Sequence, residues 1–237
     1  MLPFTDDSPG NSRANSPRKS RADSRVTLLG DRPPIDLERL YDPPGRLVAG
    51  VDEVGRGALF GPVVSAAVTL AQDALEPLAA AGVTDSKLLS AVRREQLAVT
   101  IQNLALDCKI GVASVREIDR LNILNASLLS MRRAVLRLSP LPDHCLIDGN
   151  QRVPDLEIPQ TTLIKGDRHS IAIAAASIIA KVWRDRLITR LAVQYPQYDL
   201  VANKGYGTAK HRLALQQLGP SRQHRLSFSP CQLELQL

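Results

Sequence analysis

The chain of 237 residues carries 30 Lys and Arg against 24 Asp and Glu, which gives a formal net charge of +6 at pH 7. Its apolar fraction is 44% but only 3% of its residues are aromatic, so Leu, Ile, Val and Ala must fill the core. The three cysteines are odd in number and far apart, which argues against a disulfide framework or a zinc module. No segment approaches a membrane span, and the N-terminus lacks the apolar core of a signal peptide. We therefore expect a cytoplasmic protein with no membrane partner.

The first 45 residues differ in composition from the rest of the chain. They are rich in Ser, Pro, Asp and Arg, and their seven basic and seven acidic residues cancel in charge. They contain no periodic apolar segment that could offset the entropy of ordering, so we interpret residues 1–45 as a flexible tail. The alternative is a nucleic-acid-touching arm over residues 13–25, where five basic residues accompany a single acid.

From residue 46 onward, apolar runs alternate with segments of helical periodicity. We predict strands over 47–51, 62–70, 109–115, 145–147 and 161–165, and helices over about 91–105, 117–138, 171–191 and 208–218. Ser90 is expected to cap the first helix, and Gly219-Pro220 to end the last one. This order predicts a mixed α/β sheet covered by helices, with a main domain over 46–198 and a smaller helical part over 199–237.

The smaller C-terminal part is also the most basic. Residues 200–237 contain one acid, Glu234, and five basic residues: Lys204, Lys210, Arg212, Arg222 and Arg225. Such a surplus is typical of a surface that meets a polyanion, although a solvated basic face has the same composition.

Carboxylates stand at the ends of three predicted strands. Asp52 and Glu53 end the first, Asp148 follows the fourth, and Asp167 follows the fifth. Strand ends are where sheet folds place their sites. Mg²⁺ and Mn²⁺ prefer oxygen ligands, and a two-metal phosphodiesterase needs several carboxylates. A solvated strand end, an Asp-Gly turn or a helix cap would explain each acid singly, so it is their conjunction that indicates a site.

The first pair of acids imposes a geometric condition. Neighbours in a regular strand point to opposite faces, so Asp52 and Glu53 can serve one site only if the strand ends or bulges there. The turn Gly55-Arg56-Gly57 follows at once and gives the strand a reason to end. Its glycines would also let the backbone approach a phosphodiester closely.

These residues belong to six motifs that resemble the type 2 ribonucleases H, the ribonuclease HII family. The resemblance covers about residues 46–230, and its motifs appear in the family's order. They are AGVDEVGRG at 49–57, DSKLLS at 85–90, IDGN at 147–150, KGD at 165–167, AASIIAKVWRD at 175–185 and NKGYGT at 203–208, and His224-Arg225 and Ser227-Phe228 follow them.

The resemblance implies a ribonuclease H-like mixed five-stranded sheet and a C-terminal basic helical extension. It implies an endonuclease that hydrolyses the RNA strand of RNA–DNA hybrids and incises at ribonucleotides embedded in duplex DNA, leaving 5′-phosphate and 3′-hydroxyl ends. By position, Asp52 would bridge two divalent cations, Mn²⁺ or Mg²⁺. Glu53 and Asp148 would complete one cation site, and Asp167 the other. One cation would activate the attacking water and the other would stabilise the leaving oxygen.

The same resemblance assigns the substrate contacts. Gly55, Arg56 and Gly57 with Tyr206 would sense the 2′-hydroxyl, the group that distinguishes RNA from DNA. Lys87 and Lys181 would contact phosphates; the alternative for Lys181 is a helix lysine that extends its ammonium to water. The partners implied are the hybrid and ribonucleotide-containing duplex DNA, and we expect a monomer.

Other polar residues receive weaker interpretations. We expect a surface role for His169, and a phosphate contact or a structural hydrogen bond for His211 and His224. Asp185 is expected to pair with a nearby Arg on its helix.

Three alternatives remain for the function. Another nuclease of the same sheet fold, such as a junction resolvase, would share the acids but not the Gly-Arg-Gly turn with a distant Gly-Tyr-Gly. A type 3 ribonuclease H would carry a folded N-terminal substrate-binding domain, for which the 45-residue tail is too short and too polar. A hybrid-binding module without catalysis would not need all four acids.

Overall fold

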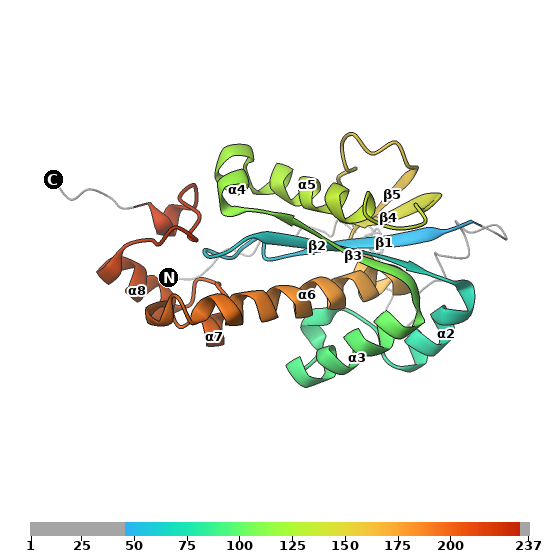
Figure 1. The fold of residues 1–237 in the computed structure, drawn as a ribbon, viewed down its shortest axis with the longest axis horizontal. Helices are drawn as coiled ribbons and strands as arrows, with labels where there is room; N and C mark the ends of the chain where they lie inside the picture. The colour runs from blue at the N-terminus through green and yellow to red at the C-terminus, as the bar shows by residue number, and fades with distance from the viewer. Residues whose placement is uncertain (1–45, 233–237) are drawn as a thin grey trace, which may run out of the picture. The chain divides into compact units, whose positions relative to one another are not determined.

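The computed structural model of the chain describes residues 46–232 and shows five strands in one sheet, ordered β3-β2-β1-β4-β5. β1 pairs antiparallel with β2 and β2 antiparallel with β3, whereas β1–β4 and β4–β5 are parallel. Helices cover both faces of this sheet (Figure 1). The predicted mixed five-stranded α/β sheet is confirmed. The predicted tail, residues 1–45, lies outside the described residues.

The elements follow one another as the sequence pattern indicates, with several additions. The strands are β1 Val48–Val54, β2 Val63–Leu70, β3 Ala105–Ala113, β4 His144–Asp148 and β5 Gln160–Leu163. The α-helices are α2 Gln72–Ala80, α3 Ala91–Leu104, α4 Val115–Leu121, α5 Ile123–Val135, α6 Ile171–Ala192, α7 Leu200–Asn203 and α8 Ala209–Leu218. Single turns of 3₁₀ helix are η1 Ser86–Leu88, η2 Gly166–Arg168, η3 Pro196–Tyr198 and η4 Ser229–Cys231.

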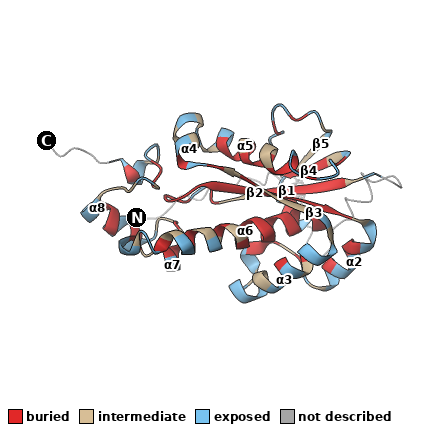
Figure 2. Cartoon of the chain, viewed as in Figure 1, coloured by how far each residue is buried: buried red, intermediate tan, exposed pale blue. Residues whose placement is uncertain are grey.

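Each face of the sheet has its own apolar core. On one face, side chains of β2 pack against α2, α3 and α6, and on the other, side chains of β1, β2 and β4 pack against α5. Figure 2 shows the central strands as mostly buried, and β2 and the first half of α6 are buried throughout. With so few aromatic residues, both cores consist mainly of Leu, Ile, Val and Ala, as the composition requires.

The helix α6 lies unusually close to β1. A Cβ atom built on Gly50 would stand 2.1 Å from the carbonyl carbon of Ala172, so only a glycine fits beneath this helix. The small residues Ala172 and Ala174–Ala176 continue the contact along α6, and all are buried. This packing brings the backbone of α6 against the strand that carries the first two acids.

Two predicted elements differ from those observed. The helix expected over 117–138 is two helices, α4 and α5. Asn122 separates them, because its φ of 67° is incompatible with an α-helix. The Asn122 side chain instead caps α5 by accepting the Asn125 N–H. The strand expected over 109–115 is β3, which begins at Ala105. Ser114 caps the next helix through a capping box with Glu117, so the strand cannot reach Val115.

The C-terminal part packs through an apolar cluster of its own. Leu59 and Phe60, which precede β2, join residues of α6, α8 and η3 around Tyr198. Ser90 caps α3 as predicted, and Thr208 caps α8. The division at residue 198 stays a prediction. The three cysteines form no disulfide, and no helix among residues 46–232 is long and apolar enough to cross a membrane.

The close contact of α6 with β1 yields a stability prediction. Gly50→Ala should lower the free energy of unfolding by about 3 kcal/mol, because the new methyl group would overlap the α6 backbone. Gly57→Ala is the matched control, since a Cβ atom there meets nothing within 4 Å. Urea unfolding of the two variants measures the difference; equal stabilities would show that α6 can move away at little cost.

Candidate active site

The parallel pairing of β1 with β4 brings the first acids together. The last register pair of these strands is Val51 with Ile147, and Asp52 and Asp148 follow directly at the carboxyl ends. β5 lies next to β4, with Leu163 opposite Asp148, and the chain then enters η2, which holds Asp167. Four acids that are up to 115 residues apart in sequence thus come to one edge of the sheet.

Asp52 and Glu53 share a site without a break in the strand. β1 continues in regular register with β2 as far as Val54, so the expectation that it ends or bulges at the two acids is wrong. Its pairing with β4 has ended at Val51, which leaves this edge of β1 open to side chains. There Asp52 turns back and accepts the Glu53 N–H at 2.6 Å. Both acids line one cavity of about 310 Å³.

Burial and mutual repulsion make these carboxyls hard to ionise. Burial, followed by the charges of Glu53 and Asp148, raises the pKa of Asp52 well above its ordinary value. Burial also raises the pKa of Glu53, with Asp148 adding to the effect and Arg56, 3.3 Å away, opposing it. For Asp167, burial and then the charges of Asp85 and Asp148 raise the pKa to about 6. A bound cation would relieve this repulsion.

Lys87 is the cation at the centre of the acids. Burial opposes its charge, but the attraction of four carboxylates prevails and raises its pKa. Those carboxylates, in order of effect, are Asp85, Asp167, Asp52 and Asp148. The lysine that the sequence assigned to phosphate thus also faces three of the predicted site acids.

Sequence reasoning missed three polar residues of this site. Asp85 caps η1 by accepting the Lys87 N–H, pairs with Arg168 at 3.3 Å and hydrogen-bonds the Asp167 side chain. Ser86 and Ser177 are joined at 2.9 Å between their Oγ atoms, and Ser177 hydrogen-bonds Asp52. All three stand in the quoted motifs, but residue type alone assigns none of them a role in the site.

The Gly-Arg-Gly turn lies beside Tyr206. Ala58, the residue after the turn, forms a β-bridge with Tyr206, and the Gly205 carbonyl accepts the Leu59 N–H at 2.8 Å. Gly55 has φ 91°, and a Cβ atom there would stand 2.2 Å from Nε of Arg184. The side of the turn with Arg56 and Gly57 is exposed.

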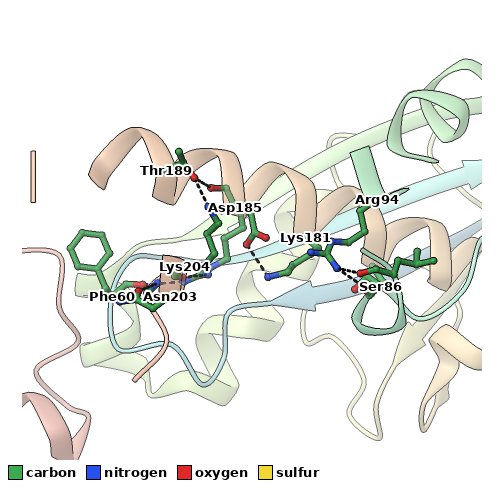
Figure 3. Close-up of polar contacts among 12 residues, drawn as sticks. Phe60, Ser86, Arg94, Lys181, Asp185, Thr189, Asn203 and Lys204 are labelled. Atoms are coloured by element: carbon green, nitrogen blue, oxygen red, sulfur yellow. Dashed lines mark hydrogen bonds and ion pairs between the residues drawn. The ribbon is translucent and has the colours of Figure 1, made fainter. Parts of the chain in front are cut away.

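Lys181 and Tyr206 close the cavity from the α6 side. Nζ of Lys181 lies 5.7 Å from the centroid of the Tyr206 ring, and Arg184 approaches the same ring at 5.5 Å. Lys181 also donates to Asp185 at 2.9 Å (Figure 3). Asp185 therefore pairs with a lysine one turn earlier, and the expected pairing with an arginine is wrong.

A second, larger cavity lies between α3 and α6. It has a volume of about 650 Å³, and its lining includes Arg94, Trp183, Arg190 and Lys204. Lys204 donates to Thr189, and Arg94 donates to the Ser86 carbonyl, which links this cavity to the acid cluster (Figure 3). The lining holds four Lys or Arg residues against two acids, Glu95 and Asp185, and so carries a net positive charge.

Two fully buried arginines hold the loops around the site. Arg184 donates to the main-chain carbonyls of Phe60, Pro62 and Lys204. Arg225 donates to the carbonyls of Arg56 and Gly61. Burial lowers the pKa of both guanidinium groups, that of Arg225 to about 9. These arginines are structural cations that bind backbone dipoles.

The histidines follow the predictions. His169 is exposed, and His211 and His224 are buried and hydrogen-bonded to each other. Of the two expectations for that pair, the structural hydrogen bond is the one observed.

The acids are not arranged as a finished metal site. Among residues 46–232, no group of three or more His, Cys, Asp or Glu side chains could hold a metal ion as placed. The carboxylates bind protein donors instead; Asp148 Oδ1, for example, accepts the Gly166 N–H at 2.7 Å. The donor set nevertheless suits a hard divalent cation, because buried carboxylates that repel one another gain most from added positive charge.

Comparison with known proteins agrees with this site. The family profile of Ribonuclease HII matches residues 49–231. The ribonuclease HII of Trichodesmium erythraeum is 66% identical over 189 residues, which cover 80% of this chain and 90% of the relative. That of Acaryochloris marina is 64% identical over 188 residues, covering 79% and 95%.

A solved structure has the same architecture. Ribonuclease H2 from Pyrococcus horikoshii aligns with a TM-score of 0.67 at 27% identity, covering 78% of this chain and 95% of that one. The fold and the enzyme class, a ribonuclease H, are confirmed. The profile match and the high identity to whole relatives decide the family: this chain belongs to the ribonuclease HII family.

Proposed function

We propose that this ribonuclease cleaves the RNA strand of RNA–DNA hybrids and also incises duplex DNA at single embedded ribonucleotides, leaving 5′-phosphate and 3′-hydroxyl ends. One observation carries the proposal: a single cavity is lined by Asp52 and Glu53 on one side and by Tyr206 on the other. Carboxylates that can serve phosphodiester hydrolysis therefore stand next to a ring that can contact the adjoining sugar.

Two divalent cations, Mn²⁺ or Mg²⁺, complete the proposal. Asp52, Glu53 and Asp148 would hold one, and Asp52 and Asp167 the other. Bound cations would lower the pKa of a water molecule and stabilise charge on the phosphodiester. The protein contributes buried carboxyls whose mutual repulsion a bound cation would relieve, and the strand ends that hold the acids.

The substrate contacts divide between backbone and side chains. Gly57 has open space around it, so a nucleotide can approach the backbone there, next to Tyr206. Lys87 and Lys181 offer ammonium groups on the same cavity, and the charged lining between α3 and α6 could extend the contact with the duplex. The cytoplasmic location and the monomeric state remain expectations.

Asp148→Asn tests the proposed metal site. The amide keeps an oxygen that can accept the Gly166 N–H but removes a charge from the cluster, so kcat should fall at least about 100-fold while hybrid binding survives. Asp155→Asn is the control, because it removes the same charge at an exposed position with φ 51°, which Asn tolerates. Cleavage and binding are measured in Mg²⁺ and in Mn²⁺. Cleavage by Asp148→Asn at the rate of the control would remove Asp148 from the site.

Tyr206→Ala tests recognition of the sugar. Loss of the ring should reduce cleavage at a lone ribonucleotide at least about tenfold, the effect of one lost stacking contact. A continuous hybrid offers many ribonucleotides at which the enzyme can bind and cleave, so its cleavage should be affected less. Tyr206→Phe separates the hydroxyl from the ring. An unchanged rate at the lone ribonucleotide in Tyr206→Ala would make this tyrosine structural.

The electrostatics of the acid cluster predict a pH-dependent stability. The pKa of Asp167 is about 6 in the fold and ordinarily near 4, so its ionisation costs stability as the pH rises through this window. Asp167→Asn in a chelator should therefore be more stable than the parent by about 2 kcal/mol at pH 8, and no more stable at pH 4. The amide can still donate to Asp85. Chemical denaturation at both pH values measures this, and a variant less stable than the parent at pH 8 would contradict it.

A further inference from the structure

A chain of hydrogen bonds joins the C-terminal segment to the Gly-Tyr-Gly loop. The Ser221 N–H donates to Nδ1 of His224 at 2.9 Å. Nε2 of His224 lies 3.0 Å from Nε2 of His211, and Nδ1 of His211 lies 2.9 Å from the Tyr206 carbonyl oxygen. Both rings are buried, with exposures of 1% and 0%. The proposed function gives this chain no role.

The carbonyl end of the chain determines the protons in it. A carbonyl can only accept, so Nδ1 of His211 must donate to Tyr206. A neutral imidazole carries one proton, so Nε2 of His211 must accept and the proton of His224 lies on Nε2. Nδ1 of His224 is then an acceptor for Ser221, whose N–H and hydroxyl both lie 2.9 Å from it. Each donor therefore meets an acceptor, and the bonding partners permit a single tautomer for each ring.

Burial keeps the pair neutral. It lowers the pKa of His211, and burial together with the neighbouring His211 lowers the pKa of His224 to about 4. A second proton on Nε2 of His211 would set two N–H groups against each other. The rings of Tyr198 and Phe60 pack edge-on against His224 and leave no room for it to turn away.

The chain ends on the residue that the proposed function assigns to the sugar. The Tyr206 carbonyl accepts from His211 and from the Thr208 N–H at 2.9 Å, so both of its lone pairs are used. At the other end, His224 forms a β-bridge with Phe60, two residues after the bridge between Ala58 and Tyr206. Both ends are thus attached to the segment that follows the Gly-Arg-Gly turn.

We propose that His211 is a positioning residue for ribonucleotide recognition: its Nδ1–H holds the main chain of Tyr206 so that the ring faces the sugar, and His224 selects the tautomer that makes this possible. The inference rests on the proposed function of Tyr206. It adds to that function a requirement for one hydrogen-bond donor at a defined atom in the α8 helix.

A pair of amide substitutions tests the donor. In His211→Asn the amide nitrogen can take the place of Nδ1 and donate to the Tyr206 carbonyl, whereas in His211→Gln it lies nearer Nε2 and cannot. Cleavage is measured on a single-ribonucleotide duplex and on a continuous hybrid in Mg²⁺, with thermal unfolding as the control for folding. His211→Gln should cleave the single ribonucleotide about tenfold more slowly, as expected for one lost buried hydrogen bond, with a smaller loss on the hybrid. His211→Asn should recover most of that rate.

Two results would overturn the positioning role. One is equal activity of the Asn and Gln variants on both substrates, and the other is a loss that affects both substrates alike and follows the loss in unfolding temperature. Imidazole ¹⁵N–¹H correlation spectra of the parent at pH 7 add a readout that does not depend on cleavage. They should show the proton on Nδ1 of His211 and on Nε2 of His224, and any other tautomer would contradict the chain.

The outcomes also separate this inference from the proposed function. If the parent fails to cleave at a lone ribonucleotide, or if Tyr206→Ala cleaves it normally, the proposed recognition fails while the tautomers can still be as assigned. If Tyr206→Ala is impaired and the two amide variants are equal, recognition by Tyr206 stands and the role of His211 fails.

Discussion

The close packing of α6 on β1 is the constraint on which the site depends. Because Gly50 has no side chain, α6 lies against the strand itself, and residues at spacings of three and four along the helix then face the acids. Ser177 reaches Asp52, and Lys181 and Arg184 lie beside Tyr206. One rigid helix thus aligns the carboxylates with the residues proposed to bind substrate, and a shift of this helix would disturb both sets together.

Charge is arranged oppositely in the two halves of the site. The acid half holds buried carboxylates that repel one another and attract Lys87, a state that favours binding of a cation. The other half, around Tyr206, holds the buried guanidinium groups of Arg184 and Arg225, which donate to backbone carbonyls. Buried charges of this kind are costly unless they are hydrogen-bonded, but their several donors fix loop backbone that has no regular pairing. Rigid loops are what the discrimination of a single hydroxyl group requires.

Much of the fold and the identity of the acids could be predicted from the sequence. The strand and helix pattern led to a mixed sheet of five strands, and the helix cap at Ser90 was recognised from residue type alone. The break at Asn122 was missed because apolar spacing continues across it, and only the backbone conformation ends the helix. The partner of Asp185 is Lys181, four residues earlier on the same helix, and not the arginine that the sequence predicted.

Sequence by itself determined which residues are candidates for the chemistry: oxygen ligands at three strand ends, a glycine turn and a tyrosine between glycines. These features are local, because each can be recognised from residue type and spacing within one strand or loop. Tertiary structure alone decided how Asp52 and Glu53 share a cavity, because this depends on where β4 leaves β1. It also decided that His211 and His224, 13 residues apart, form one chain of hydrogen bonds, because proton positions follow from partners that only the folded chain brings within 3.0 Å.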